Sequence, residues 1–180
     1  MPRQTTVSVD RLNGIIACLV PAITVLRDLH GVFETPFIQV IVETTLSLIN
    51  TVKTAKRNKS ESAELLENIH EILYCIIGIL LKSENVGSLP PAMLEHLGRF
   101  THTINQIYTF IEARQDRNTI QNLLRRSEMN TLLQDCRAGL QQASEIFKAI
   151  VIDVPEVKSF AKQLQLILHF AIKAQDIPRA

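Results

Sequence analysis

The stretch PFIQVIVETTLSLINTVKTAKR, residues 36–57, decides the fold. Its apolar residues recur at intervals of three and four, which places them along one side of an α-helix. Thr35 and Pro36 are a typical helix start, with a hydroxyl that can cap the helix and a proline at its first position. The predicted buried stripe of this helix consists of Ile38, Ile41, Val42, Thr45, Leu48, Ile49, Val52 and Ala55.

Five other segments have helical periodicity, a short helix is predicted between the third and the fourth of them, and no segment alternates with the period of a strand. Pro21 lies inside the first of them, where an interior proline removes a hydrogen bond and favours a kink or a break. Gly31 favours a stop just after His30. The predicted helices cover residues 9–29, 60–82, 90–114, 119–126, 128–150 and 155–174.

The apolar stripes have to be buried against one another, so the sequence predicts an all-α protein. We expect an up-and-down four-helix bundle over residues 9–114, with one or two additional brace-like helices packed on it over residues 115–180. Residues 1–8 are expected to form a flexible N-terminal lead. The whole chain is predicted to fold as a single compact domain.

The composition is that of an ordinary globular protein, with 46% apolar and 21% charged residues in a chain of 180. The formal net charge of +1 argues against a dedicated nucleic-acid binder, which usually has a strong basic excess. The longest apolar run, residues 72–81, is half of the roughly 20 residues that a membrane-spanning helix needs. An odd number of cysteines on predicted helices favours free thiols in a reducing compartment, so we expect a cytoplasmic protein.

The titratable residues show no pattern of a catalytic or metal site. His96 and His102 are six residues apart, which does not place two zinc ligands on one helix face. Cys75 lies in an apolar run, where burial raises the pKa of a thiol and makes it unreactive. Glu64, Glu67 and Glu71 are interpreted as a solvated acidic helix face. The sequence therefore predicts a protein that is not an enzyme and needs no metal or cofactor.

Two groups of basic residues lie near predicted helix ends. The structural interpretation of the first group is that its cations stabilise the dipole at the end of the second helix. The functional interpretation is attraction to anionic lipid, worth about 1 kcal/mol for each basic residue near a charged surface. The first group is Lys53, Lys56, Arg57 and Lys59, and the second is Arg114, Arg117, Arg125 and Arg126.

The first helix is unusually apolar over residues 15–26, IIACLVPAITVL. One interpretation is that this helix is simply buried in the core. The other is that it can leave the bundle and insert into a membrane. The candidate insertion residues are Ile15, Ile16, Leu19, Ile23 and Leu26.

A family resemblance that covers about residues 10–150 is carried by three stretches. They are KTAKRNKSESAELLENIHEILYCII (53–77), LPPAMLEHLGRFTHTINQIYTFIEA (89–113) and EMNTLLQDCRAGLQQASEIFKA (128–149). These stretches resemble a helical domain found at the N-terminus of many mushroom-type fungal proteins. That domain is similar to the N-terminal four-helix bundle of the mixed lineage kinase domain-like pseudokinase, and more distantly to HeLo-type and plant resistance-type cell-death bundles.

The resemblance implies a non-enzymatic module for cell death or innate immunity. In such families a brace, matched here by position to residues 119–174, holds the bundle until a signal arrives. The bundle then self-associates, moves from the cytoplasm to the plasma membrane, binds anionic lipid and permeabilises the membrane. A nucleotide-binding or kinase-like partner or parent chain is also implied. The alternative is a soluble adaptor that docks helices of a partner without membrane activity.

Overall fold

The computed structural model describes residues 3–33, 35–55, 59–83, 89–115 and 126–152. Every regular element in this part of the chain is an α-helix, which confirms the predicted all-α class. The helices are α1 (Arg3–Phe33), α2 (Pro36–Thr54), α3 (Lys59–Lys82), α4 (Pro91–Gln115) and α6 (Arg126–Ile152).

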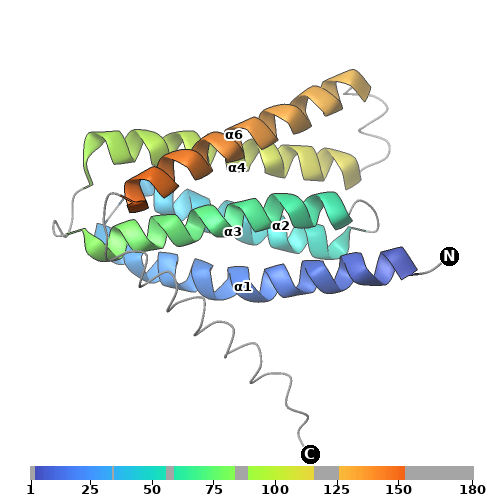
Figure 1. Ribbon diagram of the computed structural model, residues 1–180, viewed down its shortest axis with the longest axis horizontal. Helices are drawn as coiled ribbons and strands as arrows, with labels where there is room; N and C mark the ends of the chain where they lie inside the picture. The colour runs from blue at the N-terminus through green and yellow to red at the C-terminus, as the bar shows by residue number, and fades with distance from the viewer. Residues whose placement is uncertain (1–2, 34, 56–58, 84–88, 116–125, 153–180) are drawn as a thin grey trace, which may run out of the picture.

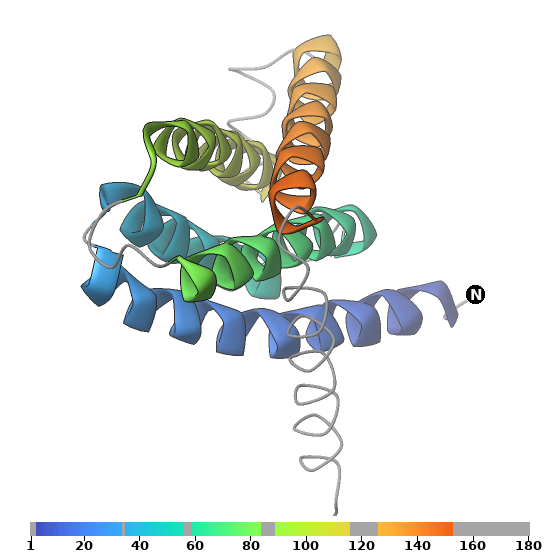
Figure 2. The same ribbon diagram turned by 60° about the vertical axis from the view of Figure 1, so that its left-hand side comes forward.

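Successive helices run in alternating directions along the long axis of the molecule (Figure 1). Helix α1 packs against α2 and α3, α2 also packs against α4, and α6 packs against α3 and α4. Figure 2 shows three layers, with α2 and α3 between α1 on one side and the pair α4 and α6 on the other. Helix α3 thus has a long helix on either side of it.

The buried residues follow the stripes that the sequence predicts. All eight residues of the predicted α2 stripe are buried. Thr35 caps α2 as expected, because its side-chain oxygen accepts a hydrogen bond from the Phe37 N–H at 3.3 Å. The second half of α3 lies at the centre of the core, where Ile76 is completely buried. Helix α4 contributes two large aromatic residues to the core, Phe100 and Phe110.

Helix α1 differs from its predicted bounds. It begins at Arg3, inside the segment predicted as a lead, and it continues past Gly31 to Phe33. Pro21 lies inside α1 and does not break it. The carbonyl left without a helical donor by Pro21 belongs to Ala17, an exposed residue, so that carbonyl can bind water instead. The helix curves around the bundle in Figure 2.

The later helix ends differ from the prediction by a few residues. Helix α2 stops at Thr54, because Ala55 adopts an extended conformation (φ −64°, ψ 129°) and ends the helix. Helix α6 begins at Arg126 and ends at Ile152, two residues beyond the prediction at each end. The predicted helix over residues 155–174 and residues 119–125 of the predicted short helix lie outside the described residues.

Candidate functional site

The described members of the two basic groups predicted from the sequence lie at the same end of the molecule. Helices α2 and α4 end there, and α3 and α6 begin there (Figure 1). We call this region the basic end and define it by Lys53, Lys59, Arg114 and Arg126. The remaining four predicted cations lie outside the described residues, in the sequence between these helix ends: Lys56, Arg57, Arg117 and Arg125.

Side-chain contacts join the helix ends that form the basic end. The Gln115 side-chain amide donates a hydrogen bond to the backbone carbonyl of Thr51, which ties the end of α4 to the end of α2. Arg114 pairs with Glu61 at the start of α3, and its guanidinium carbon lies 5.3 Å from the centre of the Phe110 ring. The charge of Arg114 is therefore paired with a carboxylate of the same protein, although the side chain is partly exposed. Lys53 is exposed, so it is freer to meet a partner.

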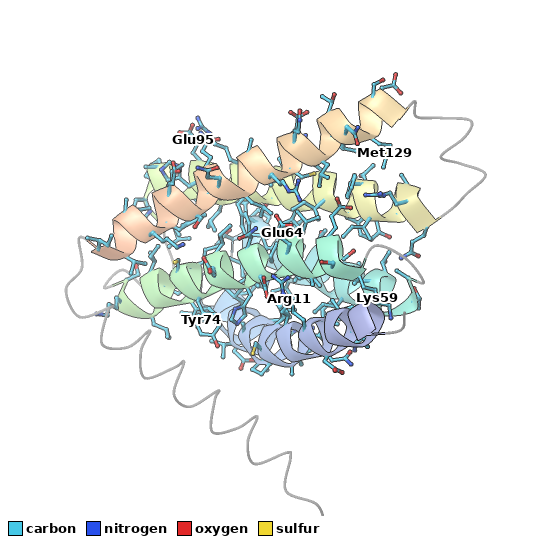
Figure 3. The ribbon with its side chains drawn as sticks, turned by 45° about the vertical axis from the view of Figure 1, so that its right-hand side comes forward. Arg11, Lys59, Glu64, Tyr74, Glu95 and Met129 are labelled. Atoms are coloured by element: carbon cyan, nitrogen blue, oxygen red, sulfur yellow. The ribbon has the colours of Figure 1, made fainter. Side chains whose placement is uncertain are left out.

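A row of four glutamates on α3 is paired with cations on three other helices. Arg11 of α1 makes two hydrogen bonds to Glu67, one of them 2.8 Å long. The other pairs are Arg114–Glu61 from α4, and Arg137–Glu64 (3.0 Å) and Lys148–Glu71 (2.9 Å) from α6. Figure 3 shows Arg11 and Glu64 in the middle of the molecule, where α1, α3 and α6 lie beside one another.

The structure adds ion-pair partners to the interpretation of Glu64, Glu67 and Glu71 as a solvated acidic face. Each carboxylate is partly exposed, but each has a cation from another helix beside it. Partly exposed pairs of this kind contribute about 0.2–1 kcal/mol each, so they do not hold the fold together. The ion pairs instead select how the helices are aligned, since they favour one register of α1, α4 and α6 along α3. The sequence shows the spacing of these glutamates along the helix, but it does not identify the cations that pair with them.

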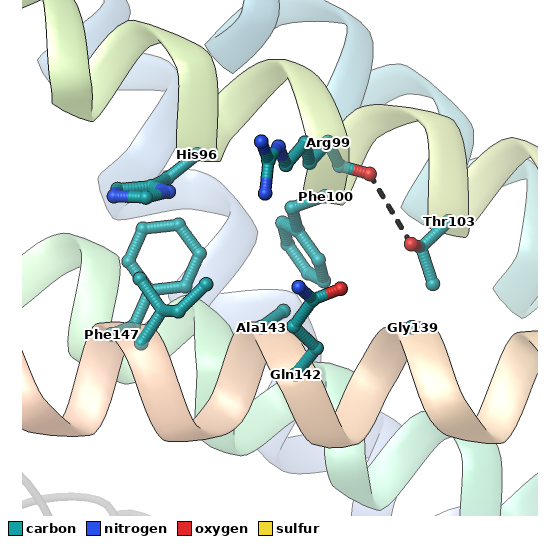
Figure 4. Close-up of a pocket in the computed structure, with 9 residues that line it drawn as sticks. His96, Arg99, Phe100, Thr103, Gly139, Gln142, Ala143 and Phe147 are labelled. Atoms are coloured by element: carbon teal, nitrogen blue, oxygen red, sulfur yellow. Dashed lines mark hydrogen bonds between the residues drawn. The ribbon is translucent and has the colours of Figure 1, made fainter.

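The apolar contact between α4 and α6 is centred on Phe147. Its ring meets Phe100 and His96 edge to face, with ring centres 6.1 and 6.5 Å apart (Figure 4). Beside it is a small cavity of about 20 Å³, which is room for one water molecule. Gly139 lets the two helices approach closely, because a Cβ atom at this position would lie 2.6 Å from the Thr103 hydroxyl. Helix α6 is thus held by close packing, with the ion pairs as additions.

The candidate insertion residues of α1 all lie in the core. Within the described part of the chain, α1 is the one helix with a segment, Val9–Phe33, long and apolar enough to cross a membrane by length and composition. A core helix of a soluble protein passes the same test, so this feature alone is weak support for insertion. The exposed fractions are 8% for Ile15, 6% for Ile16, 0% for Leu19, 2% for Ile23 and 1% for Leu26.

The described residues contain no group of three or more histidine, cysteine or acidic side chains that could hold a metal ion. All three cysteines are free thiols. Burial raises the pKa of Cys18 and Cys75, and it raises the pKa of Cys136 to about 11. These thiols are therefore poor nucleophiles at neutral pH, as the apolar surroundings of Cys75 predict.

His70 is a titratable group buried without a partner for one of its ring nitrogens, Nε2. It lies on α3 one turn before Tyr74, with ring centres 4.5 Å apart, and the Tyr74 hydroxyl is also buried without a partner. Burial lowers the pKa of His70, against the opposing effect of Glu71 and Glu67. Burial also raises the pKa of Tyr74 to about 12. Both shifts favour the neutral side chain.

Acidification is therefore expected to destabilise the protein through His70. A histidine whose pKa is lower when folded takes up its proton more readily when unfolded, so the free energy of unfolding should fall as the pH drops below about 6.5. The free energy of unfolding can be measured by urea titration at several pH values between about pH 7 and about pH 5, a range in which carboxylates stay ionised. His70→Phe should reduce this dependence, whereas the exposed His102→Phe should not. Equal pH dependence in both variants would contradict the assignment.

Comparison with known proteins gives no assignment for this site. No family model matches the chain, and neither a curated protein nor a solved structure matches it.

Proposed function

We propose that this chain is a non-enzymatic signalling module that binds anionic membranes through its basic end. The observation that carries the proposal is the meeting of two separate basic groups at one end of the helices, contributed by α2, α3, α4 and α6. The helix dipoles account for Lys53 and Arg114, in the last turns of α2 and α4, but not for Lys59 and Arg126, at the starts of α3 and α6. Together these four residues gather positive charge at one end of the helices. At about 1 kcal/mol for each basic residue, several cations can hold a protein on an anionic surface.

The proposal includes the architecture and biology that the family resemblance implies. In this architecture α1 to α4 would form the bundle, and α6, which packs on α3 and α4, would belong to the brace. The module acts in regulated cell death or immunity, moves from the cytoplasm to the plasma membrane and self-associates when the brace loosens. The packing of Phe147 and the pairs Arg137–Glu64 and Lys148–Glu71 would resist that loosening.

Membrane permeabilisation would be a second step that requires α1 to leave the core. Exposing its five buried candidate residues costs on the order of 10 kcal/mol, at about 1.5–3 kcal/mol for each large apolar side chain. A membrane interior could offset this cost, whereas water could not. Binding through the basic end leaves the core intact, so it should precede insertion.

Charge reversal at the basic end tests the proposal. The variant Lys53→Glu/Lys56→Glu/Arg57→Glu/Lys59→Glu is expected to lose sedimentation with vesicles that contain phosphatidylserine, because four attractive charges become repulsive. The wild-type protein should sediment with these vesicles, and added salt should release the bound protein because it screens the attraction. Much less protein should sediment with neutral phosphatidylcholine vesicles. The helical circular dichroism spectrum should stay unchanged.

A matched control places the same kind of change elsewhere. Arg27→Glu and Arg99→Glu reverse two exposed cations away from the basic end, so this variant should still bind. Equal binding of wild type and the basic-end variant would remove the proposed role of this surface. If the wild type ignores anionic vesicles both as a monomer and as an oligomer, the soluble adaptor becomes the better explanation.

A further inference from the structure

Ser60 is an exposed serine among the cations of the basic end. It is the second residue of α3 and directly follows Lys59, which Figure 3 labels at the start of this helix. The next serine along the chain, Ser62, is buried, with an exposed fraction of 6%. Of these two serines, Ser60 is therefore the one that a modifying enzyme can reach at the surface.

The sequence before Ser60 has the pattern that arginine-directed serine kinases recognise. Arg57 lies three residues before Ser60. Lys56 and Lys59 add two more basic residues to the same stretch, KRNKS (56–60). Such kinases bind an extended substrate and pair its arginine with their own carboxylates. Because Ser60 lies in the first turn of α3, where a helix opens at little cost, this turn can extend into a kinase while the rest of the helix stays folded.

We propose that Ser60 accepts a regulatory phosphate from an arginine-directed serine kinase. The γ-phosphoryl group of ATP is transferred to the Ser60 oxygen, ADP leaves, and the hydroxyl proton passes to the catalytic base of the kinase. The new group has about −1.5 to −2 charges at pH 7. Negative charge is favourable near the start of a helix, so the fold is kept while the basic end loses positive charge. The role of this phosphate rests on the proposed membrane function, since phosphorylation would release the protein from an anionic surface.

Phosphorylation of the full chain in solution tests Ser60 as the acceptor. The chain is treated with ATP and calcium/calmodulin-dependent protein kinase II, an arginine-directed serine kinase. Peptide mapping by mass spectrometry should place a phosphate on Ser60, and the helical circular dichroism spectrum should stay unchanged. A chain that receives no phosphate at Ser60, or that loses its helical spectrum when it does, would overturn the proposal. This measurement uses no membrane, so its result is independent of the proposed function.

Sedimentation with vesicles that contain phosphatidylserine tests the regulatory role. The phosphorylated protein should bind about thirtyfold more weakly than the untreated protein, which corresponds to about 1 kcal/mol for each of two positive charges neutralised. Kinase-treated Ser60→Ala should bind as tightly as the untreated wild type. The matched control is Ser127→Ala, which removes an exposed serine from the first turn of α6. This control should respond to the kinase as the wild type does.

The possible outcomes separate the regulatory role from the membrane role. Equal vesicle binding before and after phosphorylation of Ser60 would overturn the regulatory role and leave the membrane role intact. A response that is lost in Ser127→Ala but kept in Ser60→Ala would show that Ser60 is the wrong acceptor. If the untreated wild type does not bind these vesicles, the membrane role and its regulation both fail, and the peptide map alone decides whether Ser60 is modified.

Discussion

Replacing Phe147 with alanine is expected to lower the free energy of unfolding by about 3–5 kcal/mol, the usual cost of removing a buried aromatic ring. Phe147 is completely buried between α4 and α6, and its ring meets Phe100 and His96 edge to face. Its removal would leave a cavity next to the small one already present there. Urea unfolding followed by circular dichroism at neutral pH measures the change.

The matched control for Phe147→Ala is Glu145→Ala, an exposed position on the same helix. Its side chain accepts a hydrogen bond from Gln141 within α6 and contributes to no ion pair given above, so the effect should stay within about 0.5 kcal/mol. Limited proteolysis adds a second measurement, since a loosened α6 should be cut sooner in the Phe147 variant. A Phe147 variant with wild-type stability would show that α6 does not depend on this contact.

The second large effect is expected for Gly139→Ala, a change that usually stabilises a helix by about 0.5–1 kcal/mol. Here the new methyl group would lie 2.6 Å from the Thr103 hydroxyl and 2.9 Å from its Cγ2 atom. Both distances are far shorter than van der Waals contact, so either the Thr103 side chain or the two helices must shift. We expect a net loss of about 1–3 kcal/mol, the typical cost of overpacking, in the same unfolding measurement.

Thr103→Ala should rescue Gly139→Ala, because it removes the two atoms that come closest. The Thr103 hydroxyl donates only to the Arg99 carbonyl of its own helix at 3.2 Å, so its removal leaves no buried donor unpaired (Figure 4). Gly14→Ala in α1 is the opposite control, since a Cβ atom there would meet nothing within 4 Å. That variant should be slightly more stable than the wild type. A destabilised double variant would show that the close approach is not the cause.

The sequence predicts what depends on local periodicity. The α2 stripe and its Thr35 cap follow from spacing and helix chemistry within one segment, and the structure confirms both. The effect of Pro21 does not follow from local sequence alone, because an interior proline can break a helix or bend it. The outcome depends on whether the carbonyl of Ala17 faces water, and that depends on where the other helices lie.

The sequence does not predict what depends on neighbours far away in the chain. Glu61, Glu64, Glu67 and Glu71 gain their partners from residues 53 to 77 positions away. A side chain larger than that of glycine is excluded at position 139 only because Thr103 lies against it. The convergence of the two basic groups likewise needs the direction and order of four helices. Periodicity fixes which face of a helix is buried, but it does not identify the helix that covers that face.

The basic end has a consequence for how such a protein can diversify. Its four defining cations stand at the ends of α2, α3, α4 and α6, not in the stripes that fill the core. Substitutions at these helix ends can therefore change surface charge at little thermodynamic cost. Descendants of one ancestral chain could thus acquire different binding preferences while inheriting the same interior.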